Sequence, residues 1–297
     1  MPDDVELERY LRDVIAERLQ RKYETYGPLT WRDLEMTTLP DGSTRRTADP
    51  GRGGIWNPND MAATLSIVTS PDGPYPDREE NGLLTYHYQR ADLGDGKNAK
   101  LRRAMELGLP VIRFDKVKDN AYNVIYPTYV VGDDRTSGTF TLALDLRFKS
   151  WAFDEIPDEL ERRYAEREVK QRVHQPWFRS RVMLAYERQC TVCVLKKVPL
   201  LDAAHIISDG KSHGEAVVTN GLALCKIHHA AYDANLLGIT PDYTVSINHA
   251  LLEETDGPML LHGLQEMHGR TIALPRRKAD QPDRERLDER YQEFLAS

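Results

Sequence analysis

The feature that most constrains this chain is a pair of short metal-ligand motifs in its C-terminal half. Cys190-Thr-Val-Cys193 is followed, 32 residues after its second cysteine, by Cys225-Lys-Ile-His228. Each motif presents two soft ligands from one tight turn, and two such turns can close around one tetrahedral zinc ion. Buried free cysteines are the alternative interpretation of a lone C-x-x-C, but here the two motifs use all 3 cysteines of the chain. The spacing therefore predicts a structural zinc site. Its expected ligands are Cys190, Cys193, Cys225 and His228.

Three polar residues around these motifs are not explained by zinc binding. The run Leu200–Ile207 predicts a buried strand that ends near His205, Asn220 precedes a second apolar run, and His229 directly follows the last expected zinc ligand. A lone histidine in such a strand is more often a packed core residue than a catalyst. The combination of two histidines and an asparagine on a zinc scaffold indicates a chemical site instead.

The segment that contains these residues resembles a known nuclease family. FRSRVMLAYERQCTVC, LDAAHI and VVTNGLALCKIHHAAYDANLLGI are similar to the HNH endonucleases with the ββα-metal fold, over about residues 171–240. The resemblance implies that His205 is the general base, that Asn220 orients the active-site loop, and that His229 binds a catalytic divalent metal, Mg²⁺ or Mn²⁺. These types suit phosphodiester hydrolysis, because imidazole titrates near neutral pH and a divalent ion polarises the phosphate.

The chain departs from the commonest version of this motif, which has an aspartate directly before the first histidine. That position is Ala204 here, whereas Asp202 lies two residues earlier and, by strand alternation, on the same face. Asp202 is therefore the candidate second ligand of the catalytic metal. Asp233, four residues after His229 on an expected helix, is a candidate to hydrogen-bond a ligand side chain, with a helix-end cap as the alternative.

The first half of the chain has the pattern of a β-rich domain. Short apolar runs rich in β-branched or aromatic residues alternate with turn residues, which predicts strands. These runs cover residues 62–68, 83–88, 111–114, 123–131 and 140–144. Amphipathic spacing predicts helices over residues 4–24 and 98–107, and the polar, Gly- and Pro-rich stretch 39–59 predicts a loop or arm. The expected fold class is α+β.

A change of composition divides the chain. Residues 154–172 are charged and helix-prone with few apolar positions, which favours a linker helix that lies against solvent or bridges two domains. We therefore expect a β-rich domain with an N-terminal helix in residues 1–150, a helical linker in 151–172 and the nuclease domain in 173–297.

A second resemblance concerns the first domain. SPDGPYPDREENGLLTYHYQR, residues 70–90, is similar to the signature of the SRA (YDG) domains that bind modified cytosine. The resemblance implies a pocket that extrudes a base from the duplex, stacks it between Tyr75 and Tyr86, and reads its edge with Asp77. Ordinary strand aromatics and a turn residue are the alternative interpretation of these three positions.

Charge and targeting signals narrow the setting. The net charge of −7 argues against a protein that coats nucleic acid without specificity, but it permits a local basic groove. Arg45 and Arg46 could contact phosphates there, and nearby Trp56 either contacts DNA or packs the arm on the core. No secretory leader or membrane-spanning run is evident, and the 3 cysteines cannot build a disulfide framework, so a cytoplasmic setting without a membrane is expected.

Together these features predict a modification-dependent restriction endonuclease. Its SRA-like domain would recognise 5-methylcytosine or a related base in duplex DNA, and its HNH domain would cut nearby. One HNH site cuts one strand, so we expect a homodimer or successive nicks. The alternatives are a nicking or homing endonuclease that reads unmodified sequence, and a non-catalytic zinc-containing module that binds DNA.

Overall fold

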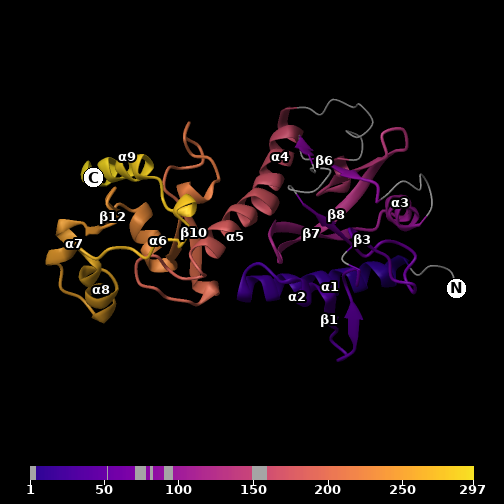
Figure 1. The fold of residues 1–297 in the computed structure, drawn as a ribbon, viewed down its shortest axis with the longest axis horizontal. Coiled ribbons are helices and arrows are strands. Elements are labelled where there is room, and N and C mark those ends of the chain that lie inside the picture. Colours follow the sequence, from indigo (N-terminus) through magenta and orange to yellow (C-terminus); the bar gives the residue numbers. More distant parts are fainter. Residues whose placement is uncertain (1–4, 52, 71–77, 81–82, 90–95, 149–158) are drawn as a thin grey trace. The chain divides into compact units, whose positions relative to one another are not determined.

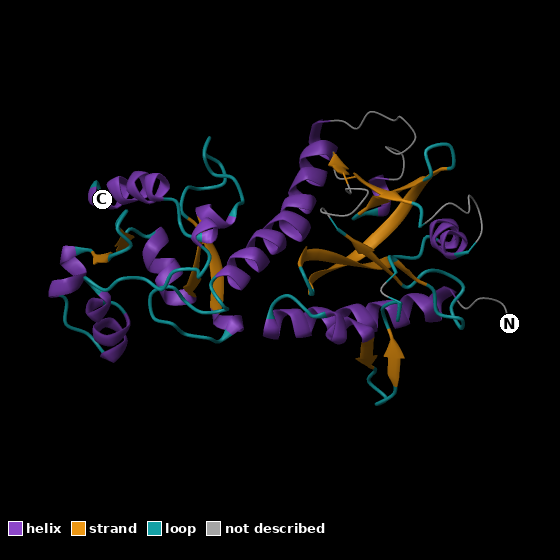
Figure 2. Cartoon of the chain, viewed as in Figure 1, coloured by secondary structure: helices purple, strands orange, loops and turns teal. Residues whose placement is uncertain are grey.

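The computed structural model divides the chain into two units, Met1–Pro176 (unit 1) and Trp177–Ser297 (unit 2). It describes residues 5–51, 53–70, 78–80, 83–89, 96–148 and 159–297. Figures 1 and 2 show the elements of both units. Helices and strands are mixed throughout, which confirms the expected α+β class. Within the described residues, no helix combines the length and the apolar character needed to cross a membrane.

The framework of unit 1 is a sheet with seven described strands in the order β3-β4-β7-β8-β9-β6-β5. Neighbouring strands are antiparallel except for β4 and β7, which are parallel. The strands are β3 (Ile55–Trp56), β4 (Ser66–Thr69), β5 (Arg78–Glu80), β6 (Leu83–His87), β7 (Val111–Lys118), β8 (Ala121–Asp134) and β9 (Thr139–Ala143). Each of the five expected runs overlaps one of these strands.

Helices α1 (Val5–Tyr26) and α3 (Lys97–Leu107) cover opposite faces of this sheet. The alternation of side chains along β7 makes this possible. Ile112 packs in the cluster that includes α1, whereas its neighbour Val111 packs in the cluster that includes α3. The apolar run at β7 is therefore a strand that is buried on both sides.

The buried face of α1 contains Ile15 and Leu19, which lie at apolar helical spacing, but it also contains a charged residue. Leu7 is exposed, while Arg12 is completely buried. The Arg12 guanidinium donates to the carbonyls of Thr64 and Pro110 and pairs with Glu8 at 2.9 Å. Because buried carbonyls need donors, the helix turns its arginine inward and leaves Leu7 in solvent.

Residues 39–59, expected to be a loop or arm, contain regular structure. After the short helix α2 (Trp31–Glu35), strands β1 (Met36–Thr38) and β2 (Thr44–Arg46) form an antiparallel hairpin, which extends beyond α1 in Figure 2. Its turn contains Gly42 at φ +83°, a conformation that glycine adopts without strain. Short strands with one exposed side lack the alternating apolar pattern that would have revealed them.

The expected linker is in large part a component of unit 1. Helix α4 (Glu159–Val169) leads into a π-helical turn, Lys170–His174, and then into α5 (Gln175–Ala185). Val173 is buried against Ile125 and Leu144 of the sheet, and Arg172 donates to the Leu144 carbonyl at 3.0 Å. These contacts extend unit 1 to Pro176.

Unit 2 is a small domain in which two strands and a helix follow a cysteine-containing turn. Strand β10 (Leu201–His205) pairs antiparallel with β11 (Gly221–Cys225), and α6 (Lys226–Asp233) begins at the end of β11. The remaining elements are β12 (Leu237–Ile239), β13 (Val245–Ile247), α7 (His249–Glu253), α8 (Pro258–Gly263) and α9 (Arg284–Leu295). The core packs α5 against β11, and this order of strand, strand and helix is the expected ββα unit.

Candidate metal centre and active site

The four expected zinc ligands converge on one point. Their ligand atoms all lie within 4.8 Å of one another. The Sγ atoms of Cys193 and Cys225 are 3.9 Å apart, and Nδ1 of His228 lies 3.1 Å from Cys225 Sγ and 3.4 Å from Cys190 Sγ. Tetrahedral zinc with ordinary bond lengths would separate two sulfurs by about 3.8 Å and a sulfur from a nitrogen by about 3.6 Å. The donor set and its spacing therefore fit a structural zinc ion.

The surroundings of His228 prepare it to bind a cation. Its Nε2 donates to the Gly263 carbonyl at 2.7 Å, which leaves Nδ1 directed at the sulfurs. Burial lowers the pKa of His228, but hydrogen bonds to Cys190 and Cys225 outweigh burial and raise it to about 10. The cluster thus stabilises positive charge at its centre, which suits a bound cation.

A second group of polar side chains lies where β10 meets α6. Nδ1 of His229 is 3.7 Å from an Asp202 carboxylate oxygen, and its Nε2 is 3.4 Å from Asp233. Asp202 also pairs with Lys226, and Arg179 Nε lies 3.9 Å from it. The structure therefore brings together Asp202, His229 and Asp233, although they come from two elements.

The charges in this group favour an ionised carboxylate. The nearby imidazole of His229 lowers the pKa of Asp202 to about 2, with burial opposing and Lys226 assisting. The same contact raises the pKa of His229. A carboxylate oxygen beside an imidazole nitrogen is a donor pair suited to Mg²⁺ or Mn²⁺, so Asp202 and His229 fit a catalytic divalent ion. Asp233 would then hold the other ring nitrogen and orient the ring.

His205 occupies the end of β10, directly opposite Gly221 of β11. Its ring stacks on Phe178 of α5, with centroids 4.0 Å apart and planes 17° from parallel. Strand alternation directs His205 and Asp202 to opposite faces of β10. Phe178 was missed by the motif analysis, because only its membership of an apolar helix marks it in the sequence.

Asn220 is fully buried and binds the loop that follows His205. Its Oδ1 accepts from the Ile207 amide at 2.9 Å, and its Nδ2 donates to the carbonyls of Ile207 at 3.0 Å and Glu215 at 3.1 Å. One side chain thereby closes both ends of the loop. Because the loop begins just after His205, Asn220 also limits how that histidine can move.

The three residues expected to form the modified-base pocket are only partly described. Tyr75 and Asp77 lie outside the described residues. Tyr86 lies on β6 with 6% of its surface exposed, and its hydroxyl donates to the Gly54 carbonyl at 3.0 Å. The pocket stays a prediction.

Comparison with known families assigns unit 2. Residues 190–240 match the family described as HNH endonuclease. This segment contains the zinc cluster, β10, β11, α6 and the polar residues described above. Unit 2 therefore carries an HNH endonuclease domain, as its motifs predict.

Solved structures and curated proteins complete the comparison. The modification-dependent restriction endonuclease TagI is similar at 18% identity and a TM-score of 0.33, covering 82% of this chain and 85% of its own. The SRA domain of SUVH5 in complex with hemimethylated CG DNA has 22% identity and a TM-score of 0.23, covering 33% and 75%. The type IV phosphorothioation-dependent enzyme ScoMcrA has 15% identity and a TM-score of 0.22, covering 72% and 54%. None of the curated proteins compared matches the chain.

Proposed function

We propose that this protein is a modification-dependent endonuclease, in which unit 1 selects duplex DNA carrying a modified cytosine and unit 2 hydrolyses a phosphodiester bond nearby. The observation that carries the hydrolytic part is the arrangement of β10, β11 and α6 beside the zinc cluster. It presents Asp202 and His229 together and holds His205 between Phe178 and the Asn220-bound loop.

In this proposal each side chain of unit 2 has a separate task. His205 accepts a proton from the attacking water, because imidazole takes up protons near neutral pH. Asn220 holds the loop after His205, and Phe178 holds the ring. Asp202 and His229 would hold a divalent ion, and such an ion would supply polarisation of the phosphate and stabilisation of the leaving 3′ oxygen. The zinc cluster keeps β11 and α6 together, since its ligands come from both sides of their junction.

The selective part of the proposal rests on the SRA-like signature of residues 70–90. A flipped cytosine would stack between Tyr75 and Tyr86, with Asp77 reading its Watson–Crick edge and the added methyl group filling an apolar niche. TagI is a modification-dependent restriction endonuclease, and the structure of the SUVH5 domain was solved in complex with methylated DNA. We therefore propose 5-methylcytosine as the first modified base to test with this protein.

Assembly follows from the number of active sites. One HNH site cuts one strand, so a double-strand break needs two chains or two successive events. We propose a homodimer on the target duplex.

The test is digestion of two plasmids that are identical except for cytosine methylation, with added Mg²⁺ or Mn²⁺. Cleavage of the methylated plasmid alone is the expected result. Equal cleavage of both plasmids would contradict modification dependence and favour an endonuclease that recognises unmodified sequence. Binding of the methylated plasmid without cleavage by either metal would favour a non-catalytic DNA-binding module. A His205→Ala preparation, purified in the same way, controls for contaminating nucleases.

A further inference from the structure

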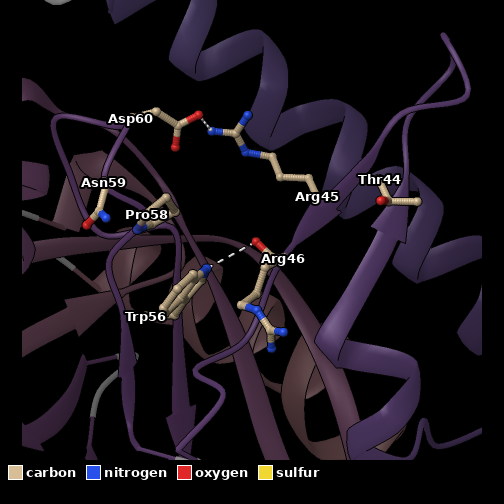
Figure 3. Close-up of a pocket in the computed structure, with 7 residues that line it drawn as sticks. All are labelled: Thr44, Arg45, Arg46, Trp56, Pro58, Asn59 and Asp60. Atoms are coloured by element: carbon tan, nitrogen blue, oxygen red, sulfur yellow. Dashed lines mark hydrogen bonds and ion pairs between the residues drawn. The ribbon is translucent and has the colours of Figure 1, made fainter.

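A pocket in unit 1 lies between the β1–β2 hairpin and the loop that follows β3, and its lining includes Arg45, Arg46 and Trp56, the candidate DNA contacts of this part of the sequence. Its volume is about 390 Å³, in the lower part of the range of about 300–1,000 Å³ that is usual for ligand sites. The side chains that matter for its chemistry are Arg45, Arg46, Trp56, Pro58 and Asp60 (Figure 3).

One wall of the pocket is apolar and fixed in place. The indole N–H of Trp56 donates to the Arg46 carbonyl at 3.0 Å, and the half-buried ring packs against the core that includes α1. Pro58 lies beside it in the lining. A fixed aromatic ring next to a proline offers a flat contact surface for a sugar ring.

The other side of the pocket carries the guanidinium of Arg45, whereas the side chain of Arg46, the next residue of β2, points to the opposite face of the strand. Arg45 pairs with Asp60 at 2.5 Å, and Arg46 pairs with Glu35 at 2.6 Å. Figure 3 shows the Arg45 guanidinium and Trp56 on opposite sides of the open space. Each guanidinium has five N–H donors, so one carboxylate leaves most of them for another acceptor. Nε of Arg45 is buried without a hydrogen-bond partner among the described residues.

The carboxylates on these arginines are replaceable. Asp60 is 67% exposed and Glu35 36% exposed, measured on their side chains. Ion pairs with exposed partners contribute only about 0–1 kcal/mol, so a bound anion can displace them at little cost. Before DNA binds, the ion pair with Asp60 holds the Arg45 guanidinium at the pocket, which reduces the entropy lost on binding.

We propose that this pocket binds one backbone phosphate of the target duplex together with its deoxyribose. Arg45 donates to the phosphate oxygens, because a guanidinium group matches phosphate geometry, and the sugar packs on Trp56. The inference rests on the proposed function, since it takes DNA as the substrate. A phosphate contact carries no sequence information but sets the register of a protein on a duplex. The pocket would therefore position DNA on unit 1 for base recognition.

The first test is the salt dependence of binding to an unmodified duplex, measured by fluorescence anisotropy on the full chain without added divalent metal. Loss of one phosphate contact lowers the slope of log K against log salt by about 0.9. The affinity advantage of wild type over Arg45→Ala should therefore shrink about 3.5-fold between about 50 and about 200 mM salt. Arg103→Ala is the matched control, because Arg103 is a similarly paired arginine on α3, which covers the other face of the sheet.

The second test uses a variant that is expected to bind the duplex more tightly than wild type. Asp60→Asn removes the carboxylate that competes with phosphate for Arg45, so it should strengthen duplex binding by up to about fivefold. If the Arg45–Asp60 pair only stabilised the hairpin, Asp60→Asn would weaken binding or leave it unchanged. Thermal unfolding of each variant verifies folding, and Arg45→Gln replaces Arg45→Ala if the alanine variant does not fold.

The outcomes separate this inference from the proposed function. If wild type cuts methylated DNA but Arg45→Ala binds like Arg103→Ala, or if Asp60→Asn binds more weakly, the phosphate site is overturned and the nuclease assignment stands. If wild type binds no duplex at low salt and cuts neither plasmid, both proposals fail. A lower salt slope in Arg45→Ala together with tighter binding by Asp60→Asn supports the site.

Discussion

At the scale of single residues, the candidate base His205 has one partner inside its motif and one outside it. Asn220, the central residue of the motif, binds the loop after His205, as the resemblance implies, and Phe178 stacks on the His205 ring. The spacing of the motif does not reveal the contact with Phe178, because Phe178 comes from a helix that precedes the cysteines. The type of each motif residue could be predicted from sequence, whereas its support depends on the fold.

The first prediction concerns His205 itself. His205→Ala should lower the rate of cleavage by roughly 10²–10⁴-fold, the usual effect of removing a general base. DNA binding should stay near that of wild type, because the base acts in the chemical step. His213→Ala is the control, since His213 is exposed on the loop that connects β10 to β11. Cleavage by His205→Ala at the rate of His213→Ala would remove His205 from the mechanism.

At the scale of elements, helix α5 and strand β11 approach so closely that only glycine fits between them at one point. A Cβ on Gly221 would lie 2.4 Å from Val182 Cγ2 and 3.0 Å from Phe178 Cζ. Gly221 is also the cross-strand partner of His205. The packing of α5 on β11 and the position of the His205 ring are therefore linked through Phe178.

Gly221→Ala tests this link. Overpacking of this kind costs about 1–3 kcal/mol of stability, and displacement of Phe178 should also lower kcat at temperatures where the variant is fully folded. Gly210→Ala is the matched control, because nothing lies within 4 Å of a Cβ there. Thermal unfolding and steady-state cleavage are measured on both variants. A Gly221→Ala protein that is less stable but has the kcat of Gly210→Ala would separate Phe178 from catalysis.

The four expected zinc ligands connect several elements of unit 2. They join the turn after α5 to the junction of β11 and α6, and the hydrogen bond from His228 to the Gly263 carbonyl adds α8. We expect one zinc ion per chain after dialysis, measured by elemental analysis. Cys193→Ser should lower the midpoint of thermal unfolding and the solubility, because zinc binding contributes to folding free energy. The prediction would be contradicted if a chelator removed zinc from the wild-type protein and the midpoint of thermal unfolding did not change.

The elements show what a sequence can and cannot predict. Ligand spacing identified the Cys3His cluster, apolar runs identified β7 and β8 because their residues are buried, and the resemblance to HNH endonucleases implied the ββα unit. The β1–β2 hairpin has only three residues in each strand and one exposed side, so no period marks it. The inward turn of Arg12 depends on carbonyls of distant strands, which no local pattern encodes.

At the scale of the whole molecule, the proposed function places recognition in unit 1 and cleavage in unit 2. A variant of unit 1 should therefore change which DNA is bound, while the rate constant for cutting bound DNA stays the same. The burial of Tyr86 decides how this can be tested. Alanine at a buried tyrosine leaves a cavity that costs several kcal/mol, about 3–5 for comparable aromatic residues, and could unfold unit 1.

Tyr86→Leu is the better test, because leucine fills much of the space but offers no aromatic face. Stacking on an aromatic ring contributes about 1–3 kcal/mol per base, so affinity for a methylated duplex should fall about 5- to 150-fold. Affinity for the unmodified duplex, which depends on phosphate contacts, should barely change. Tyr86→Phe is the control: it keeps the ring and loses only the hydrogen bond to Gly54.

Titrations of paired duplexes that differ by one methyl group, at one salt concentration, measure this difference. A wild type without methyl preference would end the SRA interpretation and leave an HNH endonuclease that reads unmodified sequence. A preference that survives in Tyr86→Leu would place the pocket elsewhere in unit 1. A preference lost in both Tyr86→Leu and Tyr86→Phe would assign the effect to the hydroxyl and its bond to Gly54, because the phenylalanine ring can still stack.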